Sequence, residues 1–286
     1  MKNRFLRTLR RLGRTVLLLL LVALGTIGLT RFGPGYFTDE REIDPRHASA
    51  GRAELAVEQR DHGTVTAIAL HTFGGWLHGS FGQSRQYGVP VMELVSPRLA
   101  VTGLLLTRAI VCGWLLAFGV ALLCSLARRW QTLLGAPFTL LLAVPVGAMG
   151  TICLLANKGG PALVLTVLLA ARDFKFASRL FHVGWNAPHM LQARAQGLGT
   201  TQMIWAHLLP GLSAQLLSLA TLSIVTALSA VVPVEVIFDL PGVGQLAWSA
   251  AMNRDLPVLS TVTLLLATSV TCANMVSDHV QSVEAL

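Results

Sequence analysis

Charged residues are scarce in this sequence of 286 residues, because Asp, Glu, Lys and Arg together make up only 13%. Soluble domains contain about 25% of these residues. Hydrophobic residues make up 53% and the mean hydropathy is +0.62, and long uncharged runs exclude an ordinary soluble protein. The composition therefore predicts an all-α membrane protein that crosses the bilayer several times. The net charge of +8 is concentrated beside apolar runs, where Lys and Arg orient a membrane protein, so we predict no nucleic-acid partner.

The sequence also has no phosphate-binding loop of the form Gly-x-x-x-x-Gly-Lys-Ser/Thr. Any ATP chemistry must therefore come from another chain. Cysteine is scarce, and its four positions lie within apolar runs without a Cys-x-x-Cys pair: Cys112, Cys124, Cys153 and Cys272. This pattern predicts small core residues instead of disulfides or a metal site.

A basic segment without acidic residues begins the chain. Its six cations are Lys2, Arg4, Arg7, Arg10, Arg11 and Arg14. We interpret residues 1–14 as a cytoplasmic tail and residues 15–34 as the first membrane span. A cleaved signal peptide is the alternative, but further spans follow and no convincing A-x-A cleavage site is present.

Residues 35–97 form one long polar region with mixed charges, which predicts an external loop region with one or two short helices on the membrane surface. It contains four histidines: His47, His62, His71 and His78. Their spacing matches no tight set of metal ligands. We interpret them as solvated loop residues and predict no metal site, with a metal cluster as the alternative.

Residues 98–280 are predicted to contain five more spans. They are Leu99–Ala127, the run between Arg129 and Lys158, a helix from the Asn157–Pro161 turn to about Phe181, Gly211–Val234, and Val258–Ser277. Six spans place both termini in the cytoplasm, with 281–286 as a short tail. Residues 182–210 then lie in the cytoplasm and the loop 239–257 lies outside.

Several residues are unusual for a membrane span. Arg108 is either a functional charge within the second span or an interfacial residue, with Ala109–Ala127 as the true span. Pro137 and Pro145 are expected to interrupt the third span, while Gly147 and Gly150 allow close helix approach. The charged residues of the fourth span are expected in its cytoplasmic third, paired along the helix or reaching water: Arg172, Asp173, Lys175 and Arg179.

Five stretches resemble the permeases of binding-protein-dependent ABC importers, in particular the dipeptide, oligopeptide and nickel branch. Ala193, Gly197 and Leu209-Pro210 fit the pattern E-A-A-x-x-x-G-x9-I-x-L-P. The other stretches are Trp76–Gly82, Glu235-x-x-Phe238-x-x-Pro241-Gly242-x-Gly244, Asn253–Pro257 and Asn274–Asp278. The resemblance covers roughly residues 70–280 and the basic first span. The sequence departs from the pattern where Leu191 replaces the usual glutamate, Gln192 the next alanine and His207 the isoleucine.

This resemblance implies that residues 182–210 contain a short coupling helix that docks into a groove of an ATPase subunit. The implied docking residues are Leu191, Gln192, Ala193, Arg194, Gly197, Leu198, Gly199, Leu209 and Pro210. Helical spacing places Ala187, Leu191, Ala195 and Leu198 on one face, as helix-in-groove recognition requires. Gly197 and Gly199 are expected to end the helix with left-handed backbone angles, and Pro210 to begin the next span. An ordinary helix–turn–helix connector without a partner is the alternative.

The outer end of the fifth span permits two interpretations. Glu235, Phe238, Pro241, Gly242 and Gly244 are either at the mouth of a translocation path, as a gate, or form a helix-ending turn with a water-facing carboxylate. Asp255 and Arg254 are interpreted as a solvated loop pair that contributes little energy.

The function implied by the resemblance is that of a permease subunit in a bacterial inner membrane, importing peptides or a related small solute by alternating access. The implied partners are ATPase subunits, a second similar permease and an external solute-binding protein, within the lipid bilayer. The chain would not be an enzyme and would bind no cofactor, since ATP and Mg belong to the ATPase. An export system on the same fold is one alternative. A membrane enzyme or ion-coupled carrier acting without an ATPase is another, but it would need paired acids or histidines deep in the spans.

Overall fold

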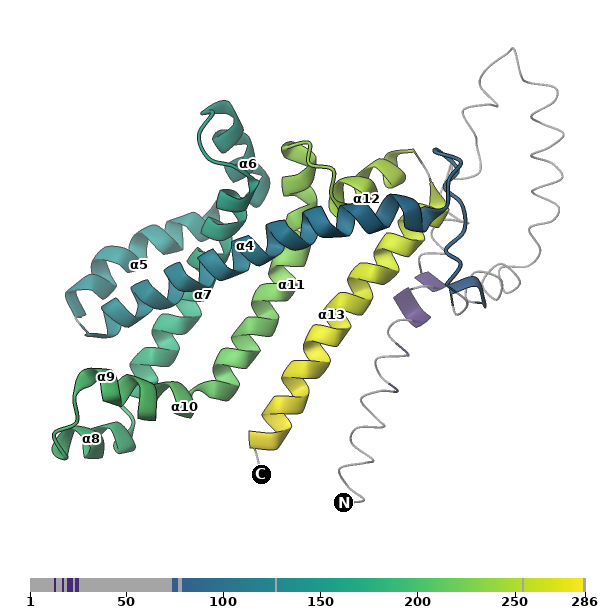
Figure 1. Cartoon of the computed structure of the whole chain (residues 1–286). Coiled ribbons are helices and arrows are strands. Elements are labelled where there is room, and N and C mark those ends of the chain that lie inside the picture. The colour runs from purple at the N-terminus through teal and green to yellow at the C-terminus, as the bar shows by residue number, and fades with distance from the viewer. Residues whose placement is uncertain are drawn as a thin grey trace, which may run out of the picture. The chain divides into compact units, whose positions relative to one another are not determined.

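The computed structural model describes residues 79–126, 128–253 and 255–284, with residues 74–76 and scattered helical positions between 13 and 25. Most of the predicted N-terminal tail, first span and external loop region, including the four histidines, therefore lies outside the described residues. The described chain is helical, which confirms the predicted all-α class. Its helices are α4 (Val91–Leu126), α5 (Arg128–Ala143), α6 (Val146–Leu155), α7 (Pro161–Trp185), α8 (Pro188–Ala195), α9 (Thr200–Met203), the π-helical η2 (Ile204–Leu208), α10 (Leu209–Gly211), α11 (Ser213–Ile237), α12 (Val243–Met252) and α13 (Leu256–Glu284) (Figure 1).

Three of these helices are long and apolar enough to cross a membrane, over Val91–Ser125, Ser213–Ile237 and Leu256–Val276. The pair formed by Leu133–Ala143 and Val146–Leu155 would count as a fourth span if it is one broken span. Four charged residues between positions 172 and 179 of α7 make that helix more polar than these. The predicted total of six spans stays a prediction.

The third predicted span is bent by 97° between α5 and α6. Pro145 directly precedes α6 and is itself extended. Its ring disfavours helical geometry in Val144 before it, and α5 accordingly ends at Ala143. Pro137, by contrast, lies inside α5 without ending it, so its predicted interruption is wrong. The next turn was predicted correctly: Asn157 and Gly159 have positive φ angles of 49° and 86°, and α7 begins at Pro161.

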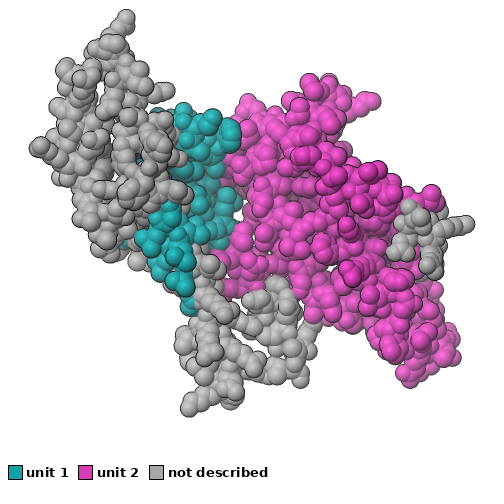
Figure 2. Space-filling view, turned by 180° about the vertical axis from the view of Figure 1, so that it is seen from behind, with its two compact units in different colours: residues 1–97, 246–269 teal, residues 98–245, 270–286 magenta. Residues whose placement is uncertain are grey.

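The chain divides into two compact units, residues 1–97 with 246–269 and residues 98–245 with 270–286 (Figure 2). In the second unit, α7 packs against both α11 and α5, and α6 packs against α11. Small residues permit this packing. A methyl group at Gly113 of α4 would lie 3.1 Å from Cβ of Leu169 on α7, and one at Gly150 of α6 would lie 3.4 Å from the Ile237 side chain.

The cysteines divide between the interior and the surface of the helices. Cys124 is buried, as predicted, and Cys153 is partly buried. Cys112 and Cys272 are exposed, so their assignment to the core was wrong. All four are free thiols.

Candidate functional site

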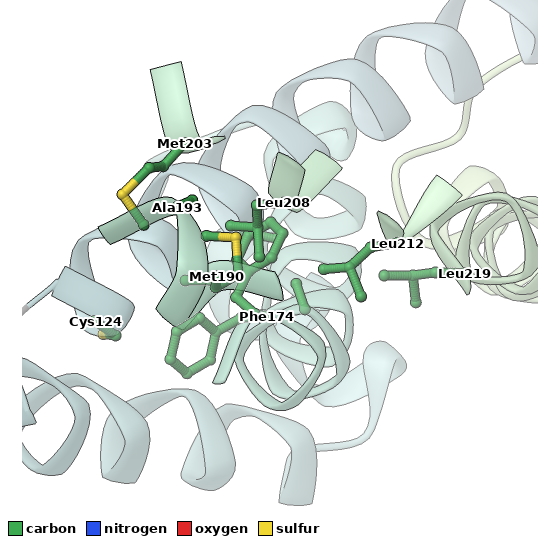
Figure 3. Packing of buried hydrophobic residues seen from close by; sticks show 12 residues of the cluster. Cys124, Phe174, Met190, Ala193, Met203, Leu208, Leu212 and Leu219 are labelled. Carbon is green, nitrogen blue, oxygen red and sulfur yellow. The ribbon is translucent and has the colours of Figure 1, made fainter. Parts of the chain in front are cut away.

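The segment 182–210 folds into short helices that gather where α7 ends and α11 begins (Figure 1). Helix α8 is fixed by its inner face, since Met190 is 0% exposed and Ala193 is 2% exposed. Both side chains belong to a hydrophobic cluster with Phe174 of α7 and Leu208 of η2 (Figure 3). Three residues are close to one helical turn, so positions 190 and 193 share this face. Ala193, an implied docking residue, is therefore used for packing within the chain.

The opposite face of α8 is open. Leu191 is 58% exposed, and the side chains of Gln192, Arg194 and Ala195 are exposed as well. The predicted docking face is thus only half exposed: Leu191 and Ala195 are free of the core, whereas Ala187 and Leu198 pack against the hydrophobic cluster. The sequence pattern placed this face differently because it did not reveal the internal contacts of Met190.

Arg194 is held in place by the end of α7. Its Nη2 donates a hydrogen bond to the Trp185 carbonyl oxygen at 3.3 Å, and its guanidinium lies 5.1 Å from the centroid of the Trp185 ring. An arginine above an aromatic ring is attracted by the ring quadrupole. The single Lys or Arg in the sequence between residues 182 and 210 is therefore oriented before any partner binds.

Helix α8 ends in a Schellman motif, as the glycine pattern predicted. Gly197 has φ +77°, its N–H donates to the Arg194 carbonyl, and the Leu198 N–H donates to the Ala193 carbonyl. This pair of bonds satisfies two carbonyls at the end of a helix, and glycine is the residue best suited to its left-handed angle. Gly199 has φ −67°, so the predicted left-handed role of this second glycine is wrong.

The rest of the segment returns the chain to α11. Leu208 in η2 is buried and Leu209 packs partly against the same cluster, whereas Trp205 is 71% exposed. Pro210 lies in α10, one short turn before α11 begins at Ser213, close to its predicted position. No pattern in the sequence pointed to Gly184, where a methyl group would lie 2.8 Å from the Leu208 side chain and 3.1 Å from that of Leu212, so both leucines would have to shift.

Glu235 near the end of α11 is fully buried, with 0% exposure, so the interpretation as a water-facing carboxylate is wrong. Its carboxylate accepts hydrogen bonds from the Thr102 hydroxyl at 2.6 Å and from the backbone N–H groups of Gly244 and Gln245 at 2.7 and 3.2 Å. Thr102 in turn accepts the N–H of Val243 at 2.8 Å. These N–H groups begin α12 and have no partner within that helix. Glu235 and Thr102 together therefore form an N-terminal cap for α12.

The glycines of the same motif make room for this cap. A methyl group at Gly242 would lie 2.2 Å from the Glu235 carboxylate, and one at Gly244 would lie 2.7 Å from Cα of Val232. Phe238 is half-buried at the end of α11, and Pro241 is exposed in the turn. The acid and the two glycines thus form one packing unit, which is the physical basis of their spacing.

Asp255, in the first unit, precedes α13 and is only 1% exposed, so its interpretation as a solvated loop residue is wrong. Its Oδ2 accepts hydrogen bonds from the Ser84 hydroxyl and from the Gln86 N–H. Asn253 also donates to the Gln86 side chain at 3.1 Å. This group of bonds connects the loop before α4 to the turn before α13.

Asp173 lies in the middle of α7 and is 0% exposed, so the prediction that it reaches water is wrong, whereas its placement in the cytoplasmic third of the span stays a prediction. Its Oδ2 lies 2.7 Å from the Ser223 hydroxyl of α11. Arg172 does not pair with it through a hydrogen bond but donates to the Leu222 carbonyl at 2.9 Å. Arg108, by contrast, is exposed on α4, and both interpretations of it stay open.

The described residues form long apolar helices with a polar, compact segment between two of them, an architecture typical of the membrane subunit of a transporter. Among these residues, no group of three or more His, Cys, Asp or Glu side chains is placed to hold a metal ion. Residues 109–283 match the family described as the binding-protein-dependent transport system inner membrane component. The chain belongs to this family. It is a permease component of a bacterial ABC transport system, is located in the inner membrane, and is not itself catalytic.

Several relatives match nearly the whole chain. A probable peptide ABC transporter permease, y4tP of Sinorhizobium fredii, is 26% identical over 94% of this chain and 95% of its own length. The glutathione transport system permease GsiC of Salmonella paratyphi A is 24% identical, with 97% and 96% covered. The oligopeptide transport system permease AppB of Bacillus subtilis is 25% identical, with 82% and 84% covered. The resemblance inferred from the motifs is confirmed.

Proposed function

We propose that this chain is one of two permeases in an importer of peptides or small peptide-like solutes, such as glutathione. Support comes from the relatives, whose names describe peptide, oligopeptide and glutathione transport. A solute-binding protein delivers the solute from outside, and two ATPase subunits supply the energy. An export system is disfavoured because the family is defined by dependence on a binding protein. The permease itself binds no cofactor, since ATP and Mg are held by the ATPases.

The observation that carries the proposal is the two-sided construction of α8. Its inner residues, Met190 and Ala193, are buried, while Leu191, Gln192 and Arg194 are exposed. A short helix with a fixed inner face and an apolar anchor on its outer face is suited to helix-in-groove recognition. We therefore assign ATPase docking to the exposed residues of α8 and assign Ala193, Leu198 and Leu209 to its support.

The proposed topology has six spans with both termini in the cytoplasm. The segment 182–210 then lies on the cytoplasmic side, where the ATPases are. Helices α7 and α11 leave this segment and pack against each other. A displacement of α8 by the ATPases would therefore act on both helices together. ATP binding must favour one state over the other by several kcal/mol, about 5.5 kcal/mol for a change from 1:99 to 99:1, to drive alternating access.

The stretch from Glu235 to Gly244 is proposed to stabilise the outer gate by holding α12 against α11. The Glu235 carboxylate accepts hydrogen bonds from groups within the chain, so it fixes α12 instead of contacting solute. The solute path would then be lined by other, smaller side chains from both permeases.

The test is co-purification of the tagged permease, expressed with its native partner subunits, after Leu191→Ala and Leu191→Asp substitutions. Leu115→Ala is the matched control, because Leu115 is 72% exposed on α4 and lies outside the segment. We expect the Leu191 variants to lose bound ATPase and solute-stimulated ATP hydrolysis, with Leu191→Asp the more severe. Leu115→Ala should keep both. Normal ATPase binding by Leu191→Asp would refute docking through α8.

A further inference from the structure

The Ser223 hydroxyl of α11 lies within hydrogen-bond distance of three groups. Its Oγ is 2.7 Å from Oδ2 of Asp173 and 2.8 Å from the Leu219 carbonyl oxygen. The indole N–H of Trp114 on α4 donates to it at 3.2 Å. All four residues belong to the second unit, and Asp173 and Ser223 are both 0% exposed.

A protonated aspartate supplies these contacts with hydrogen atoms better than an ionised one. A serine hydroxyl has one hydrogen to donate and two lone pairs to accept with. With an ionised Asp173, Ser223 would have to share its single hydrogen between Asp173 and Leu219, and two full hydrogen bonds could not form. A proton on Oδ2 of Asp173 removes the conflict. Asp173 then donates to Ser223, Ser223 donates to Leu219, and the Trp114 N–H fills the second lone pair.

Glu235 in the same unit provides the contrast. Its carboxylate receives three donors, the Thr102 hydroxyl and two backbone N–H groups. An ionised carboxylate, which only accepts hydrogen bonds, fits that site without any added proton. The Oδ1 atom of Asp173, in contrast, is buried without a hydrogen-bond partner among the described residues. A buried charge without partners is costly, so this environment favours the neutral acid.

The charged groups near Asp173 do not replace the missing donors. Arg172 attracts the Asp173 carboxylate through space but donates its hydrogen bond to the Leu222 carbonyl, and Lys175 and Arg179 are exposed along α7. On α4, Arg108 and Cys112 are exposed. Residues 133–155 of α5 and α6 include Cys153 as their single titratable side chain. On α11, Glu235 lies twelve positions beyond Ser223 and is occupied by the cap of α12.

We infer that Asp173 is a proton-binding site at the contact of α4, α7 and α11. An ionisable residue inside a membrane bundle is by default a functional site. Helices α7 and α11 flank the segment 182–210, and the bond between Asp173 and Ser223 joins them in the middle. The packed arrangement binds the proton, so raising the pH weakens this contact between the two helices. Separation of α7 from α11 would release the proton. The inference goes beyond the proposed function and does not rest on ATPase docking.

The test uses the purified full-length permease in lipid nanodiscs, without partner subunits. Infrared spectroscopy in H2O and D2O detects the C=O stretch of a protonated carboxylic acid separately from that of a carboxylate. We expect an acid band at neutral pH that disappears in Asp173→Asn and persists in Glu235→Gln. Absence of the band in the wild type, or its persistence in Asp173→Asn, would overturn the inference.

Thermal unfolding at several pH values separates a proton site from a merely structural residue. The amide introduced by Asp173→Asn would donate one N–H to Ser223 and present one carbonyl oxygen, as the protonated acid does. We therefore expect Asp173→Asn to keep the wild-type Tm at low pH and to lose the decline of Tm with rising pH. Asp173→Ala should lower Tm at every pH. An equal decrease of Tm for Asp173→Asn and Asp173→Ala at low pH would contradict the inference that Asp173 is protonated.

Discussion

The Glu235 carboxylate on α11 accepts the backbone N–H of Gly244 at 2.7 Å and thereby fixes the first turn of α12. The carboxylate lies at the helix N-terminus, where unpaired N–H groups and the helix dipole favour a negative charge. Thr102 of α4 completes the cap. Three helices thus meet at one buried acid, and the stability of the cap can be tested with single substitutions.

Glu235→Ala should destabilise the permease strongly. It leaves the buried N–H of Gly244 without its acceptor and removes the acceptor of the Thr102 hydroxyl, at about 1–3 kcal/mol for each unsatisfied group. Thr102→Val leaves the Val243 N–H without its acceptor but should cost less, because one Glu235 oxygen keeps both of its backbone donors, Gly244 and Gln245. Thermal unfolding in detergent, monitored by circular dichroism, shows which of the two variants has the lower unfolding temperature. The interpretation as a cap fails if both variants unfold at the wild-type temperature.

Gly242→Ala should resemble Glu235→Ala in effect. The added methyl group would lie 2.2 Å from the Glu235 carboxylate, so either the acid or the turn must move. Gly199→Ala is the matched control, because its φ is −67° and no atom lies within 4 Å of the added methyl group. Comparison of the two unfolding temperatures checks this prediction, and a larger loss for Gly199→Ala would contradict it.

Gly197→Ala should loosen the end of α8 without disturbing the long helices. Its φ of +77° costs an alanine roughly 1–2 kcal/mol, although the added methyl group meets no atom within 4 Å. We expect reduced ATPase co-purification with nearly unchanged unfolding temperature. Gly199→Ala again serves as the control and should retain the ATPase. Loss of ATPase binding in both variants to the same degree would assign the effect to the whole loop instead of the left-handed position.

Asp255→Ala should release the loop before α4. The variant removes the acceptor of the buried Ser84 hydroxyl and of the partly buried Gln86 N–H, and a buried donor left unsatisfied costs about 1–3 kcal/mol. Limited proteolysis near Tyr87 measures the release, since that side chain is already 45% exposed. Asp239→Asn is a control in the second unit, because the aspartate is exposed and asparagine tolerates its φ of 50°. Unchanged proteolysis in Asp255→Ala would show that this bond does not fix the loop.

The predicted topology can be tested by cysteine labelling in a variant without the four native cysteines. A cysteine introduced in place of Tyr87 should react with an impermeant maleimide in intact spheroplasts, because the loop before α4 is predicted to be external. A cysteine in place of Gln192, on the exposed face of α8, should react only after permeabilisation. The opposite pattern would invert the topology.

Structural features that depend only on residues close together in the sequence could be predicted. The break before Pro161 and the end of α8 at Gly197 follow from local backbone preferences, and both were predicted. The bend at Pro145 was predicted as an interruption, but a similar expectation for Pro137 was wrong, because helical packing overrides the propensity of a single proline.

Features that depend on distant residues were not predictable from the pattern. Glu235 finds Thr102 at a separation of 133 positions, and Asp255 finds Ser84 at 171 positions. Without these partners, each acid is most simply placed in water. Asp173 was expected to pair along its helix or to reach water for the same reason, since four charges in one short stretch are typical of a solvated surface. The spacing typical of the family identified the motifs, whereas the hydrogen-bond partners of the acids became visible only in the packed structure.

The separation of α8 into a buried face and an open face has a consequence for the evolution of these transporters. Met190 and Ala193 constrain the fold, whereas Leu191 and Gln192 make no demand on it. Leu191 and Gln192 can therefore change in evolution together with the docking surface of the partner ATPase. Under the proposed docking, their departure from the usual glutamate and alanine would match this permease to its own ATPase. Such matching would weaken the binding of ATPases that belong to related importers in the same cell. A compensating change in the groove of such an ATPase would restore its binding.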